Sequence, residues 1–275
     1  MKANNIKLSL PLAVLITLVA IIYQRTTGPT YPKKVKISHS AGNVTLRLLR
    51  SYGGAGDAPI VLPLSNEKFS AKMFYRRFPT KDKWSQKDFK NTDGVLSVDL
   101  PHQPPAGKIQ YYIELNEKGN KEFKIALRED PIIIRFKGDV PVWVLGPHIF
   151  FMFIAMFCSS WTFFEAFSST VLTRKLTFIT TGCLAFGGMV LGPIVQKFAF
   201  GVYWAGFPFG YDLTDNKLLI MAIFWLAATV MNLKKTHKWT PILAGLILIA
   251  MYAIPHSTMG SQYNYEAQKV ETDVD

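Results

Sequence analysis

Five long apolar runs constrain the fold of this chain more than any other feature. A bilayer core of about 30 Å needs roughly 20 apolar residues in a helix, and runs of about 17 or more are candidates. The last two runs are short and need flanking residues or a thinner bilayer to cross. The sequence therefore predicts a membrane protein with five transmembrane helices, formed by the runs Leu8–Tyr23, Val142–Phe167, Leu176–Val195, Leu218–Leu233 and Trp239–Ile254.

The first run has two interpretations. Lys2 and Lys7 precede it, and a basic start followed by an apolar stretch is shared by signal peptides and membrane anchors. No small-x-small cleavage site follows the run, whose last residues are Ala20 to Arg25, and no lipobox cysteine is present. We therefore expect residues 1–25 to form an uncleaved transmembrane anchor, with a cleavable signal peptide as the alternative.

Lysine and arginine in the short loops predict the orientation of the five helices. Positive residues concentrate in cytoplasmic loops. They occur before the first run, between the second and third, and between the fourth and fifth, at Lys2, Lys7, Arg174, Lys175, Lys234, Lys235 and Lys238. The N-terminus is then cytoplasmic, and residues 26–140, the turn around Asp212 and the C-terminus lie outside.

The segment between the first two runs has the alternation of a β-domain. Lys108–Leu115 nearly alternates polar and apolar residues, as a half-buried strand requires. Turn signals rich in Gly, Pro, Asn and Asp separate the strands, and this number and spacing of short strands is typical of a β-sandwich. The predicted strands are Lys34–His39, Asn43–Arg50, Ile60–Leu64, Ala71–Phe78, Val95–Leu100, Lys108–Leu115, Glu122–Leu127 and Ile132–Phe136.

The expected β-domain is basic. Residues 32–140 contain 20 Lys+Arg and 12 Asp+Glu, a balance of +8. Nucleic acid is not the expected partner, because the domain lies outside the cytoplasm and its charges are dispersed over many strands. Anionic lipid headgroups or an acidic partner fit better, and the alternative is an ordinary solvated surface.

Two histidines beside apolar runs indicate a candidate site at the outer membrane face. His148 lies near the start of the second run and His256 follows the fifth, while the polar turn 210–216 carries Asp212 and Asp215 to the same face. Imidazoles and carboxylates beside hydrocarbon are costly unless they are paired, hydrated or bound. We expect these four side chains to share one pocket.

An aromatic segment leads into that turn. Residues 198–216 are too aromatic for a free loop and too interrupted for a further span, which favours an interfacial or re-entrant cap. Thr214 or Asp215 would also serve as the N-cap of the following helix, which accounts for one carboxylate without any ligand. The other residues expected to line the pocket are Gln196, Tyr203, Trp204, Tyr211 and Asn216.

Three chemistries remain open for His148 and His256. The two imidazoles could simply hydrogen-bond to backbone or lipid. They could bind a divalent metal such as copper or zinc, with Asp212 or Asp215 as a further ligand. They could also ligate haem b axially, although the site lies near the surface and no second histidine pair follows. A proton, quinone or substrate role completes the alternatives.

Two further features concern the bundle itself. Gly188 with Gly192, and Cys183 with Gly187, have the small-xxx-small spacing that lets helices approach closely, which predicts a central third helix. Glu165 is the single carboxylate within the apolar runs, and we expect it to pair with Arg174 or Lys175.

Two resemblances add to this interpretation. Residues 102–112 resemble the approach to a late strand of fibronectin type III-like domains, which implies a sandwich used for contact or presentation. Four further segments together resemble a family of bacterial polytopic inner-membrane proteins with no established activity, and that resemblance spans Arg25 to Tyr263. The segments are residues 132–138, 192–197, 203–216 and 254–257.

The sequence as a whole predicts an α+β membrane protein with an extracytoplasmic all-β sandwich inserted between helices 1 and 2. The expected regions are an anchor (1–25), a periplasmic sandwich (26–140), a four-helix bundle (141–260) with its cap (198–216), and an acidic periplasmic tail (261–275). The expected function is a non-enzymatic accessory or interaction subunit of the bacterial inner membrane that contacts an envelope or membrane protein. The alternative is a metal- or haem-binding redox protein.

Overall fold

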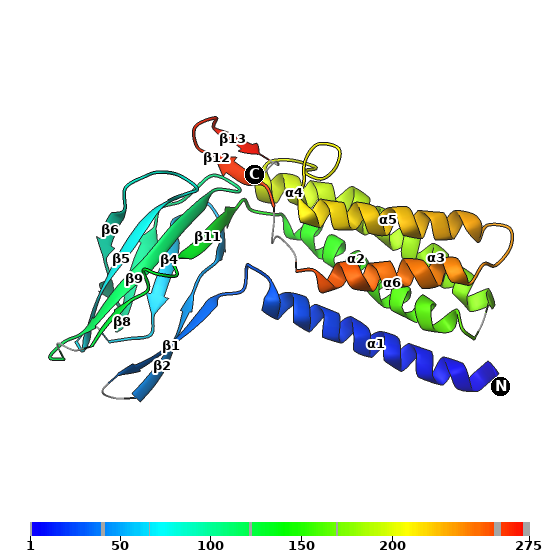
Figure 1. Cartoon of the computed structure of the whole chain (residues 1–275), viewed down its shortest axis with the longest axis horizontal. Coiled ribbons are helices and arrows are strands. Elements are labelled where there is room, and N and C mark those ends of the chain that lie inside the picture. Colours follow the sequence, from blue (N-terminus) through cyan, green and yellow to red (C-terminus); the bar gives the residue numbers. More distant parts are fainter. Residues whose placement is uncertain are drawn as a thin grey trace.

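Apolar helices and alternating strands separate into two parts in the computed structural model, which describes residues 2–39, 42–65, 67–120, 123–168, 170–255 and 260–271 (Figure 1). The fold is α+β, with a β-domain between the first two helices. The helices are α1 (Lys2–Thr27), α2 (Val142–Glu165), α3 (Thr170–Cys183), the π-helix η1 (Leu184–Leu191), α4 (Gly192–Phe200), α5 (Leu213–Met231) and α6 (Trp239–Ala253).

Four helical stretches in the described residues are long and apolar enough to cross a membrane. They are Leu8–Thr27, Val142–Glu165, Val171–Phe200 and Leu213–Met231. The fifth predicted span, α6, has 15 residues and so a length of roughly 22 Å, which is shorter than a usual bilayer core. The apolar helices therefore indicate a membrane protein, and α6 is shorter than each of these four stretches.

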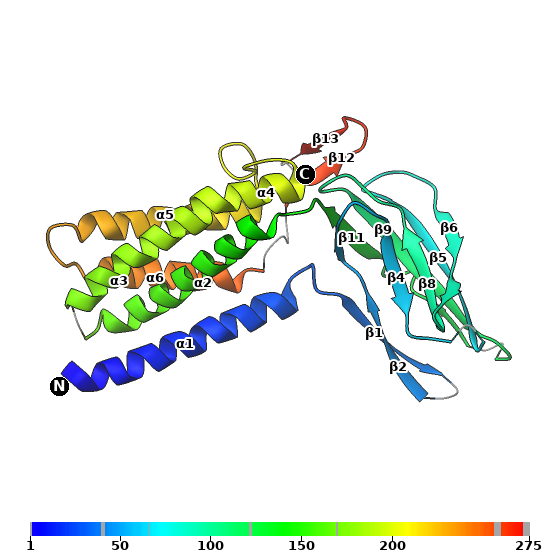
Figure 2. The same cartoon turned by 180° about the vertical axis from the view of Figure 1, so that it is seen from behind.

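The helices run in alternating directions beside one another. The N-terminus lies at the end of the bundle away from the β-domain, whereas the loop between α4 and α5 and the last described residues lie at the β-domain end (Figures 1 and 2). Five helical passages thus bring three distant segments to one end of the bundle. His148, near the start of α2, lies at this end as well.

The third helical stretch packs closely against α2 and against α5, because a glycine stands at each contact and leaves room for the neighbouring helix. A β-carbon on Gly187 would lie 2.5 Å from Phe151 Cβ on α2, and one on Gly188 would lie 2.5 Å from Leu218 Cδ1 on α5. The close approach predicted from the glycines is confirmed, but this helix lies between α2 and α5, and α2 has the central position, in contact with α1, α6 and the third stretch. The stretch continues to Phe200, so the first residues of the expected cap are helical.

Glu165 has a different partner from the one predicted. Its Oε2 accepts a hydrogen bond from Ser9 Oγ at 2.9 Å, which ties α1 to the far end of α2. Arg174 instead donates to the Leu233 carbonyl. The expected pairing of Glu165 with Arg174 or Lys175 was therefore wrong, because α1 packs against α2 and supplies a nearer donor.

The β-domain contains two main sheets that share one hydrophobic core. The eight predicted strands are confirmed within two residues at each end, and the short strands β3, β6 and β7 were not predicted. One sheet has the order β3-β11-β9-β5-β6, with β10 beside β9, and the other has the order β4-β8-β7. The strands are β1 (Lys33–His39), β2 (Gly42–Leu48), β3 (Ser51–Gly53), β4 (Ala58–Leu62), β5 (Phe69–Phe78), β6 (Ser85–Asp88), β7 (Lys90–Thr92), β8 (Val95–Leu100), β9 (Lys108–Glu117), β10 (Lys124–Ala126) and β11 (Ile132–Lys137).

The segment after α6 is a hairpin, not the expected tail. Strands β12 (Gln262–Asn264) and β13 (Lys269–Glu271) pair antiparallel. Tyr263 N donates to the Ala106 carbonyl at 3.2 Å, which attaches the hairpin to the loop before β9. Contacts with the β-domain thus order residues that have no apolar run of their own.

Candidate functional site at the junction of the two domains

The β-domain meets the helical bundle directly after β11. Gly138 N donates to the Ala199 carbonyl at 3.0 Å, in the last turn of α4. A β-carbon on Gly138 would lie 2.2 Å from the Phe198 carbonyl oxygen, which is far inside van der Waals contact. Only glycine therefore allows the strand to leave the β-domain so close to the helix end.

Arg135 is the buried cation of this junction. It lies on β11, is 8% exposed, and its guanidinium carbon lies 3.9 Å from the centre of the Phe200 ring. It also donates to the Ser261 carbonyl. Burial lowers the pKa of Arg135 to about 10, while nearby Asp212 opposes that shift. Arg135 is therefore still a cation at neutral pH.

Asp212 connects the loop, helix α5 and the segment that follows α6. Its Oδ1 accepts from Thr214 N at 2.8 Å and Asp215 N at 3.4 Å, so Asp212 is the N-cap of α5. Its Oδ2 accepts from Ser261 N at 3.1 Å. The prediction that Thr214 or Asp215 caps this helix was wrong, because the helix begins one residue after Asp212.

Arg135 and Asp212 both approach Gly260 at the position where another residue would carry its β-carbon. A β-carbon on Gly260 would lie 3.0 Å from both Arg135 Nη1 and Asp212 Oδ2. The two opposite charges are thus close, and Ser261 hydrogen-bonds to both residues. We call Arg135, Asp212, Gly260 and Ser261 the junction cluster.

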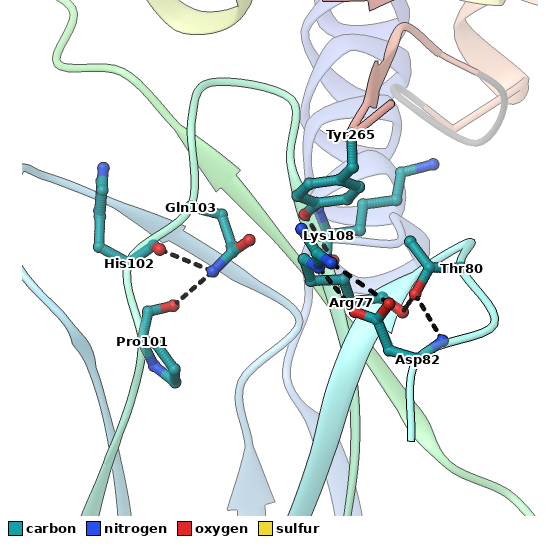
Figure 3. A network of polar contacts seen from close by, with 8 residues as sticks. All are labelled: Arg77, Thr80, Asp82, Pro101, His102, Gln103, Lys108 and Tyr265. Atoms are coloured by element: carbon teal, nitrogen blue, oxygen red, sulfur yellow. Dashed lines mark hydrogen bonds and ion pairs between the residues drawn. The ribbon is translucent and has the colours of Figure 1, made fainter. Parts of the chain in front are cut away.

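The hairpin β12–β13 holds the end of β9 through Tyr265. The hydroxyl of Tyr265 accepts from Lys108 N at 3.0 Å and donates to the Lys108 carbonyl at 2.9 Å. Arg77 lies over the Tyr265 ring at 5.0 Å, and its guanidinium pairs with Asp82 at 2.6 Å (Figure 3). The hairpin therefore fixes the edge of the β-domain that faces the bundle.

A cavity of about 370 Å³ lies inside the bundle beside this junction. Helices α1, α2, α4, α5 and α6 contribute to its wall. The lining is mostly apolar, from Leu145, Ile149, Met152, Phe153, Val195, Leu218, Met221 and Met251 among others, and its polar members include Gln24, His148, Gln196, Asp212, Asp215 and Lys217. Three of the four predicted site residues, His148, Asp212 and Asp215, therefore line one cavity.

His148 is oriented by the π-helix. Its Nδ1 lies 2.7 Å from the Gly187 carbonyl oxygen, and a β-carbon on Gly192 would lie 3.7 Å from its Cε1. Because a carbonyl oxygen only accepts, Nδ1 must carry the proton. In the neutral imidazole Nε2 is then a hydrogen-bond acceptor, and π-helical turns are frequent at functional sites.

The charged residues of the cavity are held by the surrounding backbone. Asp215 Oδ2 accepts from Ala205 N at 2.6 Å, and the Gln196 side chain hydrogen-bonds to the same carboxylate. Lys217, which is 3% exposed, donates to the Ile254 carbonyl at 2.7 Å, just beyond the end of α6. A cation is favourable there because the helix dipole is negative at its C-terminus.

Four of the residues expected to line the pocket lie outside its wall. Tyr203 and Tyr211 are 59% and 76% exposed. Trp204 Nε1 donates to the Phe207 carbonyl at 3.1 Å, and Asn216 Oδ1 accepts from Phe207 N at 2.7 Å. The hydrogen bonds of Trp204 and Asn216 hold the 201–212 loop over the start of α5. Of the five residues expected to line the pocket, Gln196 alone lines the cavity.

The second histidine of the prediction, His256, lies outside the described residues. Within the described ranges, no three His, Cys, Asp or Glu side chains are grouped so that they could hold a metal. Among the described residues that could ligate a metal, Asp212 and Asp215 line the same cavity as His148. Both carboxylates accept hydrogen bonds from backbone N–H groups.

Sequence reasoning missed Arg135, Lys217 and Gln24. Each is a polar residue in or next to a hydrophobic segment. Lys217 directly precedes the apolar run Leu218–Leu233, and this position was the available signal for it. Arg135 had a weaker signal, as one cation in the otherwise apolar strand Ile132–Phe136.

Docking of the hairpin should strengthen between pH 8 and 10. Burial, and then the charge of Arg135, lower the pKa of Lys108 to about 8, although its ordinary value is 10.5. In this window the unfolded chain keeps a proton that docked Lys108 has lost, so stability rises with pH. Above pH 10 Tyr265 opposes the trend, because burial raises its pKa to about 12.

The thermal midpoint of the purified protein, followed between pH 7 and 10, tests this expectation. Lys108→Met should remove most of the rise, and Lys36→Met, at an exposed position on β1, should leave it in place. Burial also lowers the pKa of Lys137, so part of the rise should remain in Lys108→Met. A pH profile that Lys108→Met does not change would contradict the assignment.

Comparisons with protein-family models, with curated proteins and with solved structures found no match to this chain.

Proposed function

We propose that this chain is an integral membrane interaction subunit that binds a protein partner through the outer face of its β-domain. The supporting observation is a cluster of aromatic and polar side chains on the side of sheet β5–β9 that faces away from the core. We call this cluster the outer aromatic patch, and its members are Phe74, Arg76, Trp84, Gln110 and Tyr112.

The outer aromatic patch is a packed and ordered surface. Phe74 and Tyr112 are opposite each other in the β5–β9 ladder, and their rings stack at 4.8 Å. Trp84 meets Tyr112 edge-on at 4.9 Å, and the Arg76 guanidinium lies 4.5 Å from the centre of the Trp84 ring. Arg76 is also held by Gln110 Oε1 at 3.0–3.1 Å.

Tyr112 is 4% exposed and packs against Phe74 and Trp84, so it supports the patch from within, whereas the other four members are partly exposed. The core is formed by the alternate residues of the same strands, such as Met73, Tyr111 and Ile113. Trp, Tyr and Arg are the residues most enriched in interface hot spots. A patch that is already ordered loses little conformational entropy when a partner binds, so its burial translates well into affinity.

The junction described above supports the same function. The β-domain is fixed to the bundle by Gly138, by the junction cluster and by the hairpin β12–β13. A domain held in this way presents its outer face in a constant direction relative to the membrane. This arrangement suits a subunit that positions a partner near the bilayer.

We place the protein in the bacterial inner membrane, with the β-domain, which we interpret as fibronectin type III-like, in the periplasm. The loops at the far end of the bundle contain Arg174, Lys175, Lys234, Lys235 and Lys238, and the positive-inside rule assigns that end to the cytoplasm. The partner is then an envelope or membrane protein. The resemblance to bacterial inner-membrane proteins is consistent with this location.

The test is co-purification of the full chain with its partner from membranes. Trp84→Ala together with Phe74→Ala should lower the partner yield by at least about tenfold, as expected for removal of hot-spot residues. Val61→Ala is the matched control, because Val61 is 46% exposed on β4 of the other sheet. Equal yields from both variants would contradict the proposal.

A further inference from the structure

The cavity beside the junction has the shape of a site for an amphipathic molecule. Its volume of about 370 Å³ falls in the range of small-molecule sites. Most of the wall is apolar, and three methionines, Met152, Met221 and Met251, line it. Methionine is flexible and adapts to ligands of irregular shape.

The described hydrogen bonds indicate what the polar group of the ligand must offer. His148 Nδ1 donates to the Gly187 carbonyl, so the remaining ring nitrogen, Nε2, is an acceptor. A ligand that meets this nitrogen must therefore bring a hydrogen-bond donor. Ketones, ethers and fully deprotonated acids do not satisfy it.

The charges around the cavity favour a ligand without net charge. Asp212 and Asp215 supply two carboxylates, Lys217 supplies one ammonium, and Arg135 faces Asp212 from the β-domain. The cations and anions are thus equal in number. An additional ionic group in this poorly solvated place would lack a counter-charge, which is costly.

A metal ion suits the same wall less well. The carboxylate of Asp215 accepts hydrogen bonds from Ala205 N and Gln196, and that of Asp212 accepts from α5 and Ser261. A metal would have to displace these donors and leave buried N–H groups unpaired. His148 Nε2 and Gln24 Oε1 are acceptors of the described wall for which such a donor would not have to be displaced.

We propose that this cavity binds the head of a neutral lipid that carries a hydroxyl group, with the hydroxyl donating to His148 Nε2. The apolar chain of the lipid contacts Met152, Phe153 and Met221. Two sources share this chemistry, namely an isoprenoid quinol and a long-chain alcohol. The proposal concerns binding alone and is independent of the outer aromatic patch.

Binding can be measured by calorimetry on the full chain in detergent micelles. The probes are a decyl-substituted dimethoxymethyl hydroquinol, its bis-O-methyl ether, and 1-dodecanol. The hydroquinol or the alcohol should bind at least about tenfold more tightly than the ether, because the ether cannot donate to Nε2. The stronger of the two identifies the source, whereas equal affinity of all three probes would overturn the proposal.

Two variants locate the binding. Gly192 lines the cavity, so Gly192→Leu should fill it and abolish binding, whereas Gly182→Leu, where a β-carbon meets nothing within 4 Å, is the control in the same helical stretch. His148→Leu should remove the preference for the hydroxyl over the ether, and His148→Gln should keep part of it. Unchanged binding in Gly192→Leu would place the ligand elsewhere.

The absorption spectrum and metal content of the purified protein complete the test. A Soret band or one equivalent of metal that disappears in His148→Leu would show that Nε2 already holds an ion or haem, and the lipid proposal would fail. A colourless, metal-free protein that discriminates the hydroxyl from the ether supports it. Neither result depends on whether the outer aromatic patch binds a partner.

Discussion

The Gly138→Ala variant is expected to lose the docking of the β-domain on the helical bundle. A β-carbon at this position would lie 2.2 Å from the Phe198 carbonyl oxygen, and that oxygen belongs to helix backbone that cannot rotate away. The strand must therefore retreat, which breaks the hydrogen bond from Gly138 N to the Ala199 carbonyl. Overpacking and the lost hydrogen bond together should cost about 2–4 kcal/mol.

Amide hydrogen exchange is the suitable measurement, because the effect should be regional. Protection should fall in residues 260–271 and at the end of β11, while the helices α2 and α5 keep theirs. Gly56→Ala is the control, since a β-carbon there meets nothing within 4 Å and Gly56 has no left-handed backbone. If residues 260–271 and the end of β11 were equally protected in both variants, the two domains would not be coupled through Gly138.

The helices and strands could be predicted because their patterns are local. Apolar runs and two-residue alternation depend only on neighbouring residues, and both survived almost unchanged into the structure. The hairpin β12–β13 could not be predicted in this way. Its strands of three residues are ordered by Ala106 and Lys108, which lie about 155 residues earlier in the chain.

The candidate site was predictable in place but only partly in composition. Helix direction alone brought His148, Asp212 and Asp215 to one end of the bundle, and they line one cavity. The roles of the two carboxylates depend on the path of the 201–212 loop, which turns back so that Ala205 meets Asp215. That path also keeps Tyr203, Trp204 and Tyr211 out of the cavity, although their aromatic character suggested otherwise.

Arg135 shows why buried charges are hard to assign from sequence. It lies on a strand of the β-domain, yet its contacts are Phe200 on α4 and Ser261 beyond α6. No sequence spacing relates these three positions. Its contribution follows only from the folded arrangement, in which Asp212 lies near it beside Gly260.

Replacing Asp212 should destabilise the junction more through charge than through helix capping. Asp212→Ala removes the N-cap of α5, which is worth about 1 kcal/mol, and also leaves Arg135 buried without its neighbouring carboxylate. A buried cation without a nearby counter-charge is destabilising, so this loss should add to that of the cap. Asp212→Asn keeps the cap, since asparagine and aspartate cap equally well. It removes the charge, so it should still show most of the decrease in unfolding free energy that Asp212→Ala shows.

A double-mutant cycle separates the two contributions. Arg135→Met combined with Asp212→Asn removes both charges, and the pair of changes should cost less than the sum of the single changes, because no uncompensated charge remains buried. Asp139→Asn, at an exposed position beside the junction, should alter stability by less than about 0.5 kcal/mol. Denaturant titration in detergent micelles measures the free energy of unfolding of all five variants, Asp212→Ala included. If Asp212→Asn matched the wild-type chain and Asp212→Ala did not, capping would be the dominant contribution, and the electrostatic account of the junction cluster would be wrong.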